Sequence, residues 1–297
     1  MPASPGPDFT DAIHRIGRDA EMDSIRAAIA LVAPLHNRGH HQDVEVTRDL
    51  TYGAHERHRL DVFRPTDHQG EPRPVLVFVH GGGFIGGDKA APGSPFYDNI
   101  GLWAARSGMV GVNINYRLAP QHLWPAGSDD LAAAVDWVKA HIGDHGGDPS
   151  RVFVAGTSAG AVHVAGYLAG PYGADGKVAG AMLLSCLFHM PTCEKNPLLT
   201  SYFGEDETRY PQQSTLAAMA RTPVPVLVTL AEFDPIDFER QTLAYVNAYF
   251  EARGEWPNLI RVMGHNHFTS GWHIGTADDV LAGQMLDFIR RRGRPTA

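Results

Sequence analysis

Short apolar segments with the pattern of β-strands alternate with helical segments along most of the chain. Residues 75–79 are continuously apolar, as in a strand buried on both faces of a sheet. Regular alternation of strand and helix requires right-handed crossovers, which produce a mostly parallel sheet with helices on both faces. We therefore predict an α/β fold with eight strands. The expected strands are residues 44–50, 59–63, 75–79, 109–115, 151–155, 180–184, 224–230 and 259–262, and the expected helices lie near 96–107, 127–142, 159–169, 237–253 and 277–292.

Residues 186–222 interrupt this alternation. They contain Pro191, Pro197 and Pro211 together with several aromatic residues, and proline disrupts both helix interiors and central strands. We interpret this stretch as an insertion that packs over the carboxyl edge of the sheet. Ahead of the first strand, residues 9–35 have apolar residues spaced three and four apart, which predicts one or two helices.

Charge and composition exclude several classes of function. With 25 Lys and Arg against 33 Asp and Glu, the net charge is −8 at pH 7, which argues against nucleic acids and anionic membranes as partners. The chain has no stretch of about 18 apolar residues, and its start lacks the basic and apolar regions of a secretory signal. Cys186 and Cys193 are typical of buried thiols in a cytoplasmic protein, with a local disulfide as the alternative. We therefore expect a cytoplasmic location.

The strongest functional motif is Gly156-Thr-Ser-Ala-Gly160, which follows the expected strand 151–155 and leads into a helical pattern. A tight turn of this kind raises the central serine above the sheet edge, and glycines flank it because side chains there would collide with neighbouring backbone. The turn also places the Ala159 N–H at a helix start, where the helix dipole favours developing negative charge. We predict Ser158 as a nucleophile.

A glycine-rich segment follows the apolar strand 75–79. It reads His80-Gly-Gly-Gly-Phe-Ile-Gly-Gly-Asp88, and consecutive glycines let the main chain approach a ligand and direct N–H groups toward it. A phosphate-binding loop would need a following Gly-Lys-Ser/Thr, which this segment lacks. We therefore predict an oxyanion hole formed by the N–H groups of Gly82, Gly83 and Ala159.

A serine nucleophile needs a base that takes its proton and an acid that orients the base. When these residues follow the serine in the order acid, then base, the acid lies just past a late strand. Residues 231–237 follow the strand 224–230 and contain three carboxylates. Asp234 is our first candidate, Asp237 the second and Glu232 the third, and Asp237 could instead cap the helix that follows.

The base is expected just past the last strand, residues 259–262. Residues 264–273 contain His265, His267 and His273. We select His267, with His265 as the next candidate and His273 as a structural residue. No two histidines have a convincing metal-ligand spacing with an acid, so we expect no metal.

From about residue 43 to the end, the chain resembles the hormone-sensitive-lipase-like branch of the α/β-hydrolases. The resemblance rests on four ordered motifs, which are His80-Gly-Gly-Gly, Tyr116-Arg-Leu-Ala-Pro120, Gly156-Thr-Ser-Ala-Gly160 and Asp234-Pro-Ile-Asp237. It implies Ser158 as nucleophile, Asp234 as acid and a downstream histidine as base. It also implies a cap, with residues 1–42 as an N-terminal segment over a catalytic domain of residues 43–297, and with residues 186–222 as the second part.

Two positions depart from that branch. The elbow reads Gly-Thr-Ser-Ala-Gly-Ala, where the branch usually has Gly-Asp-Ser-Ala-Gly-Gly. The candidate base reads Asn-His-Phe, where the branch usually has His-Gly-Phe. A histidine followed directly by phenylalanine resembles the arylformamidases and small feruloyl esterases, which favours His267 over His265 and widens the substrate class.

These features together predict a serine carboxylesterase that hydrolyses short-to-medium acyl or aromatic esters through an acyl-enzyme, without a cofactor. An amidase or arylformamidase would use the same triad, and a non-catalytic binding protein of this fold is a distant alternative. We expect a small-molecule ester as ligand and a homodimer as a reasonable assembly. Arg117 and Asp130 should form a buried pair that braces the loops behind the oxyanion segment. The expected substrate pocket is lined by Phe84, Leu187, Phe188, Phe203, Phe233, Ile236 and Trp272.

Overall fold

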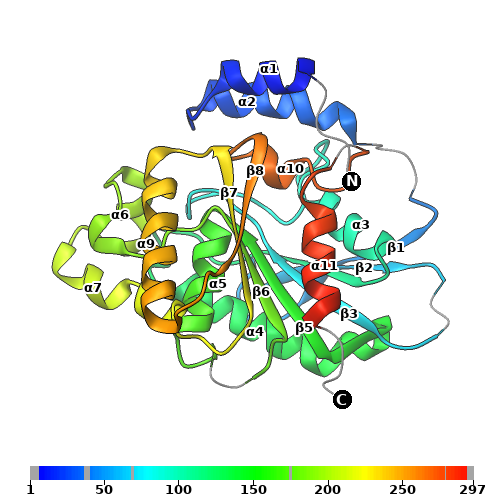
Figure 1. The fold of residues 1–297 in the computed structure, drawn as a ribbon. Coiled ribbons are helices and arrows are strands. Elements are labelled where there is room, and N and C mark those ends of the chain that lie inside the picture. The colour runs from blue at the N-terminus through cyan, green and yellow to red at the C-terminus, as the bar shows by residue number, and fades with distance from the viewer. Residues whose placement is uncertain (1–6, 37–40, 68–69, 174–175, 278, 293–297) are drawn as a thin grey trace.

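An eight-stranded sheet runs through the centre of the protein in the order β1-β2-β4-β3-β5-β6-β7-β8. The computed structural model describes residues 7–36, 41–67, 70–173, 176–277 and 279–292, and Figure 1 traces the chain through them. The strands are β1 (Val44–Thr51), β2 (Arg59–Pro65), β3 (Arg73–Val79), β4 (Val110–Ile114), β5 (Gly147–Thr157), β6 (Gly180–Leu184), β7 (Val226–Phe233) and β8 (Asn258–Asn266).

Only the β1–β2 and β2–β4 pairs are antiparallel, and every other pair is parallel. In the middle of the sheet Val77 pairs with Val112 of β4 on one side and with Val154 of β5 on the other. Every residue of β4 and β6 is buried, which is why those segments are apolar rather than alternating. The predicted eight-stranded, mostly parallel fold is confirmed.

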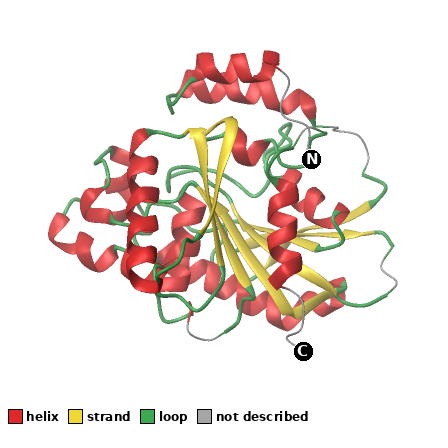
Figure 2. Ribbon diagram, in the orientation of Figure 1, coloured by secondary structure: helices red, strands yellow, loops and turns green. Residues whose placement is uncertain are grey.

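Alternate residues of β3 face opposite sides of the sheet, and helices cover both sides (Figure 2). Val75 and Val77 pack into one core together with residues of α4, α5 and α9. Leu76 and Phe78 face the other way, into a core shared with α3 and α11. These helices are α3 (Asp98–Arg106), α4 (Ala126–His141), α5 (Ala159–Ala169), α9 (Ile236–Arg253) and α11 (Ala282–Arg292).

The last of these helices begins later than the pattern over residues 277–292 predicts. Asp279 Oδ1 accepts the main-chain N–H groups of Leu281 and Ala282, both at 2.8 Å. A carboxylate that accepts these otherwise unpaired N–H groups fixes a helix start, because intrahelical bonding begins only beyond it. Asp279 therefore places the first turn at Ala282.

Two groups of helices lie outside the sheet layers. In Figure 1, α1 (Pro7–Ile16) and α2 (Met22–Val32) lie above the carboxyl edge, where Ala28 and Val32 pack with Phe96 and Trp272. The insertion predicted over 186–222 contains α6 (Pro197–Phe203), α7 (Tyr210–Gln213) and α8 (Leu216–Met219). In the same view α6 and α7 lie beside α9, and α8 contacts α9. Short helices also occur at Ala33–Leu35, Ile142–His145, Met190–Thr192, Glu207–Arg209 and Thr269–Trp272 (α10).

Among the helices within the described ranges, none is both long enough and apolar enough to cross a bilayer.

Close packing of α3 on the sheet yields a stability prediction. A Cβ on Gly101 would lie 2.3 Å from Cδ2 of Phe63, so the Gly101→Ala variant must displace a buried ring. We expect a loss of about 1–3 kcal/mol in the free energy of unfolding, as is usual for an overpacked core. Urea unfolding measures this change.

Gly283→Ala is the matched control. Gly283 lies in α11, and an added Cβ there meets nothing within 4 Å. Alanine in an exposed helix is favoured over glycine by about 0.5–1 kcal/mol, so this variant should equal or exceed the wild type in stability. Equal destabilisation of both variants would contradict the packing argument.

Candidate active site

The turn between β5 and α5 holds Ser158 in a left-handed backbone conformation, with φ of +53°. Two glycines make this turn possible. A Cβ on Gly156 would lie 2.4 Å from the carbonyl carbon of Gly160, and a Cβ on Gly160 would lie 2.2 Å from the Val79 carbonyl oxygen. No side chain fits at either position, so the sequence Gly-x-Ser-x-Gly is required by the local geometry.

Three side chains form a hydrogen-bonded row at the carboxyl edge of the sheet. Nε2 of His267 lies 2.9 Å from Oγ of Ser158, and Nδ1 of His267 lies 2.6 Å from Oδ1 of Asp234. Asp234 follows β7 and His267 follows β8, so parallel neighbouring strands deliver both to one edge. The arrangement has the geometry in which a histidine can take the serine proton while a carboxylate fixes its tautomer.

The carboxylate of Asp234 is fully buried and accepts several hydrogen bonds. Besides His267, its Oδ2 atom accepts the Ser185 hydroxyl at 2.7 Å and the Ala231 N–H at 2.6 Å. The main-chain oxygen of Asp234 also accepts the Arg18 guanidinium at 2.6 Å, from the segment that joins α1 to α2. The contacts with His267, Ser185 and Ala231 fix the orientation of the carboxylate, whereas Arg18 holds the main chain of the same residue.

The two other candidate acids take part in different contacts. Glu232 Oε2 accepts the main-chain N–H of Gly264 at 2.8 Å, and this contact links β7 to β8. Asp237 Oδ2 accepts the main-chain N–H of Glu194 at 3.0 Å, and burial raises the pKa of the Asp237 carboxyl. The capping alternative is wrong, because Pro235 occupies the N-cap position of α9 and Asp237 lies inside the first turn, where a negative charge suits the helix dipole.

The two other candidate bases lie away from Ser158. His265 is buried, its Nδ1 lies 3.2 Å from the Thr269 hydroxyl, and desolvation lowers its pKa to about 3. His273 contacts the hydroxyl of Thr276 through its ring nitrogens. The structure therefore brings only His267, of the three, to the serine.

The glycine-rich segment after β3 turns its backbone beside Ser158. Gly82 has φ of +133° and Gly83 has φ of +58°, and the Gly86 N–H donates to the Gly82 oxygen at 3.1 Å. A Cβ on Gly82 would lie 2.2 Å from the Gly86 oxygen, so only glycine allows the turn. Gly82, Gly83 and Ala159 border the same cavity as Ser158, and Ala159 is the first residue of α5, where helix N–H groups lack intrahelical acceptors.

Buried contacts behind this segment hold it in place. The His80 ring stacks on Tyr116 at 4.4 Å between centroids, and the Tyr116 hydroxyl donates to the His80 oxygen at 3.1 Å. Burial lowers the pKa of His80 to about 4, so this ring is neutral at pH 7. Arg117 pairs with Asp130 at 2.7 Å, as the sequence predicts for a structural brace.

A cavity of about 560 Å³ opens above Ser158 and His267. Of the predicted pocket residues, Phe84 and Leu187 border it. The sequence did not predict its other apolar side chains, which come from both cap segments and from residues beside the triad. They are Ala20, Met22, Ile25, Ile85, Tyr97, Val162, Leu198, Leu199, Pro235, Phe238 and Phe268.

Two predicted pocket aromatics belong to the core instead. Phe188 is fully buried and stacks on Tyr245 of α9 at 4.6 Å. Phe203 packs edge-on against Phe84 at 5.7 Å and therefore supports a lining residue from behind. The prediction that these two side chains line the pocket is wrong because burial against neighbouring rings turns them away from it.

The remaining three predicted pocket residues also lie elsewhere. Trp272 stacks on Phe96 at 4.8 Å under α2, and Phe233 packs against His14 of α1 at 4.6 Å. Ile236 is 47% exposed at the start of α9. Trp272 and Phe233 instead anchor the N-terminal helices to the carboxyl edge of the sheet.

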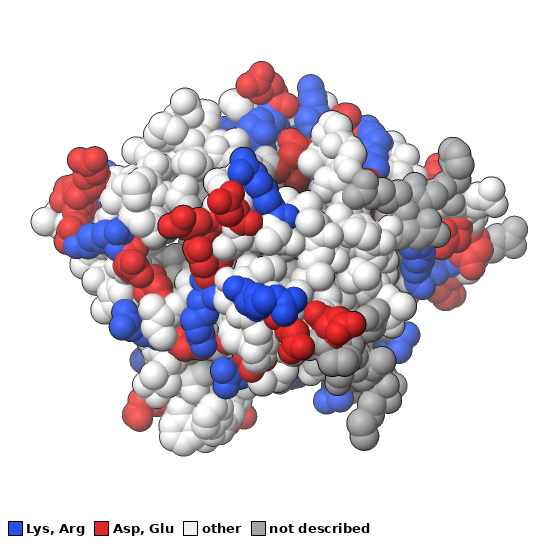
Figure 3. Space-filling model, turned by 90° about the horizontal axis from the view of Figure 1, so that it is seen from above, with Lys and Arg blue, Asp and Glu red and all other residues white. Residues whose placement is uncertain are grey.

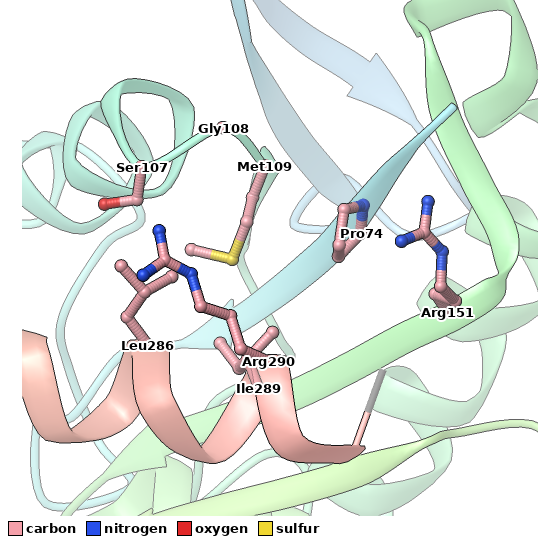
Figure 4. Close-up of a pocket in the computed structure, with 8 residues that line it drawn as sticks. All are labelled: Pro74, Ser107, Gly108, Met109, Arg151, Leu286, Ile289 and Arg290. Atoms are coloured by element: carbon pink, nitrogen blue, oxygen red, sulfur yellow. The ribbon is translucent and has the colours of Figure 1, made fainter. Parts of the chain in front are cut away.

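A second, smaller cavity of about 300 Å³ lies at the opposite, amino-terminal edge of β3 (Figure 4). Pro74 of β3, Met109 beside β4 and Arg290 of α11 border it, and Ser158 is not among its lining residues.

Viewed from above the caps, acidic and basic side chains are interspersed on the surface (Figure 3). Among the residues with described positions, no cluster of three or more His, Cys, Asp or Glu could hold a metal ion.

The chain matches a known protein family. A family model described as alpha/beta hydrolase fold matches residues 76–269. "Esterase LipC" of Mycobacterium tuberculosis is 38% identical over 113 residues, which cover 38% of this chain and 27% of that protein. The chain thus spans about a quarter of the length of this curated relative.

Two solved structures share the fold over nearly the whole chain. "Bacterial Heroin Esterase" has a TM-score of 0.71 at 24% identity and covers 98% of both chains. An esterase titled as a member of the bacterial hormone-sensitive lipase family has a TM-score of 0.70 at 21% identity and covers 97% of this chain and 99% of that one.

The distances at Ser158 predict selective labelling by a fluorophosphonate, which reacts with activated serines. We expect one adduct at Ser158, because only a serine with a base in contact is nucleophilic at neutral pH. His267→Gln should slow labelling by about 10³-fold or more. Peptide mass spectrometry identifies the labelled serine.

His265→Gln provides the control for that experiment. Its ring contacts Thr269 rather than Ser158, so labelling should stay near the wild-type rate in a folded variant. An adduct at Ser185, or undiminished labelling of His267→Gln, would refute the assignment.

Proposed function

The chain belongs to the α/β-hydrolase fold family, and we propose that it is a serine carboxylesterase acting on short-to-medium acyl or aromatic esters. The hydrogen-bonded row of Ser158, His267 and Asp234 at the foot of a largely apolar cavity carries the proposal. Such a row activates a serine for acyl transfer. Relatives with esterase names support the reaction class.

The proposed reaction has two halves. Oγ of Ser158 attacks the ester carbonyl carbon while Nε2 of His267 takes the hydroxyl proton, and the N–H groups of Gly82, Gly83 and Ala159 stabilise the oxyanion. The C–O bond to the alcohol then breaks, and His267 returns the proton to the leaving oxygen. Water attacks the acyl-enzyme by the same route, which releases the carboxylic acid and restores the serine.

The cavity supports the proposed substrate class. A volume of about 560 Å³ is in the range of sites for small molecules. Phe84, Val162, Leu187 and Leu199 offer an apolar wall beside the serine, which suits an acyl chain or an aromatic ring. The enclosing caps favour molecules of this size over large lipids.

We also propose that residues 1–42 act as a cap over a catalytic domain of residues 43–297, with 186–222 as the second part. Ala20, Met22 and Ile25 from the first segment and Leu198 from the second border the cavity, which supports this division. Arg18 links the first segment directly to the catalytic domain, because it donates to the main-chain oxygen of Asp234 and pairs with Glu239 at 2.9 Å. The cap would thereby couple closure of the site to the position of the catalytic acid.

Cellular location and assembly stay predictions. Cys186 and Cys193 are free and buried, and burial raises the pKa of both thiols, which suits the proposed cytoplasmic location. A homodimer stays the expected assembly.

Hydrolysis of 4-nitrophenyl acetate, butyrate and octanoate tests the proposed function. Ser158→Ala should lower kcat/KM by about 10³-fold or more, because the remaining oxyanion donors cannot replace the nucleophile. The profile over chain length measures the acyl pocket. Turnover that survives the substitution would contradict the assignment, and turnover of matched anilides but not esters by the wild type would point to an amidase.

Arg18→Ala tests the proposed coupling of the cap to the triad. Loss of a charge-assisted hydrogen bond at a partly exposed position corresponds to about 1 kcal/mol, so kcat should fall about fivefold. Arg26→Ala is the control, because Arg26 is 71% exposed and pairs only with Asp23 among the described contacts. Equal kcat values for the two variants would remove Arg18 from the site.

A further inference from the structure

The cavity above Ser158 has an uneven distribution of charge. Two of its lining residues are carboxylates, Glu194 and Asp237, and no lysine or arginine is among the described residues that border it. The rest of the lining is mainly apolar or glycine. A negative group in a low-dielectric cavity without a neighbouring cation attracts a positively charged ligand.

Asp237 is unusual in the lining of this mainly apolar cavity because it is a buried carboxylate. It is 7% exposed, and its Oδ2 atom accepts the Glu194 N–H at 3.0 Å. Its Oδ1 atom has no hydrogen bond of good geometry among the described residues, and the Gln241 side chain nearby lowers its pKa by less than burial raises it. A buried carboxylate with few donors is costly, and its charge is stabilised by a cation placed nearby. The mechanism proposed above does not use Asp237.

Two nearby cations are engaged with other partners. Lys195, which follows Glu194 in the sequence, forms an ion pair with Glu207, and Arg18, which contacts the main chain at Asp234, forms one with Glu239. Arg240 on α9 lowers the Asp237 pKa only through space, and its effect is smaller than the rise caused by burial. Neither carboxylate is therefore neutralised by a direct ion pair in the described contacts.

We propose that Asp237 and Glu194 form a cation subsite, so that the preferred substrates are esters that carry an ammonium group in the same molecule as the scissile carbonyl. The inference rests on the proposed esterase function and specifies its substrate class. Glu194, which is exposed, would attract the cation at the mouth, and Asp237 would hold it inside. The apolar wall formed by Phe238 and Leu198 suits the methyl groups of a substituted ammonium ion.

A purely structural role for Asp237 makes a different prediction. Its Oδ2 atom connects the loop before α6 to the start of α9 through Glu194. Asp237→Asn retains a side-chain oxygen that can accept this N–H but removes the charge. The structural role therefore predicts no change in charge selectivity, whereas the cation subsite predicts a specific loss.

Two butyrate esters of nearly identical shape separate these outcomes. Butyrylcholine carries a trimethylammonium group, and 3,3-dimethylbutyl butyrate has a carbon in place of that nitrogen. We expect the wild type at pH 8 to have a higher kcat/KM for the cationic ester. In Asp237→Asn the ratio of cationic to neutral kcat/KM should fall about tenfold, since one partly screened charge contact is lost. Glu194→Gln should lower the ratio by about two- to threefold, because Glu194 is exposed.

Glu251→Gln is the matched control. Glu251 is an exposed carboxylate on the same helix, 14 residues beyond Asp237, or about 21 Å along the axis. Its removal changes the net charge equally, so an unchanged ratio there shows that the effect is local.

The possible results distinguish failure of the cation subsite from failure of the esterase proposal. An unchanged ratio in both Asp237→Asn and Glu194→Gln overturns the cation subsite while hydrolysis of the neutral ester upholds the esterase. No turnover of either ester by the folded wild type refutes the esterase proposal itself. If Asp237→Asn does not fold, competitive inhibition of neutral-ester hydrolysis by tetramethylammonium decides. A weaker inhibition constant in Glu194→Gln supports the subsite, and absence of inhibition in the wild type overturns it.

Discussion

The contact between the nucleophile turn and the end of β3 is the constraint on which the candidate site depends. Gly160 approaches the Val79 carbonyl so closely that an added Cβ would lie 2.2 Å from that oxygen, and 2.6 Å from the His80 oxygen. This approach joins the turn that holds Ser158 to the start of the segment that holds Gly82 and Gly83. This main-chain contact therefore helps to position both the candidate nucleophile and the predicted oxyanion donors, and a side chain at position 160 would prevent it.

The order of the parallel strands brings the other side chains of the candidate site to the same edge of the sheet. Since β5, β6, β7 and β8 are parallel neighbours, their carboxyl ends follow one another along a single edge. Ser158 follows β5, Ser185 follows β6, Asp234 follows β7 and His267 follows β8. The hydrogen bonds run from Ser185 to Asp234 and on to His267, whose ring reaches back across the edge to Ser158. Residues as far as 109 positions apart in the chain thus meet without any long loop.

Much of this arrangement could be predicted from the sequence because it depends on local patterns. Apolar runs such as residues 75–79 specify buried strands, and glycines around Ser158 specify a turn. The pocket lining was predicted poorly, because an aromatic residue near a motif carries no local signal of which way it faces. Phe188 turned into the core, while Met22 reached the cavity from a helix far away in the chain. Tertiary packing determined the positions of both side chains. For Met22, the helical periodicity of residues 9–35 predicts the helix that carries it but not the cavity that it reaches.

Two carboxylates three residues apart illustrate how environment divides chemical roles. Asp234 has no exposed surface, and its oxygens accept hydrogen bonds from His267, Ser185 and the Ala231 N–H, so its charge is stabilised and directed at one histidine. Asp237, in the first turn of α9, has one oxygen on the Glu194 N–H and one with no hydrogen bond of good geometry in the described chain. A saturated carboxylate can orient a neighbour but has little capacity left for a ligand, whereas an unsaturated one gains most when a cation arrives. The difference in donors, rather than in residue type, is what separates the candidate acid of the triad from the candidate determinant of substrate charge.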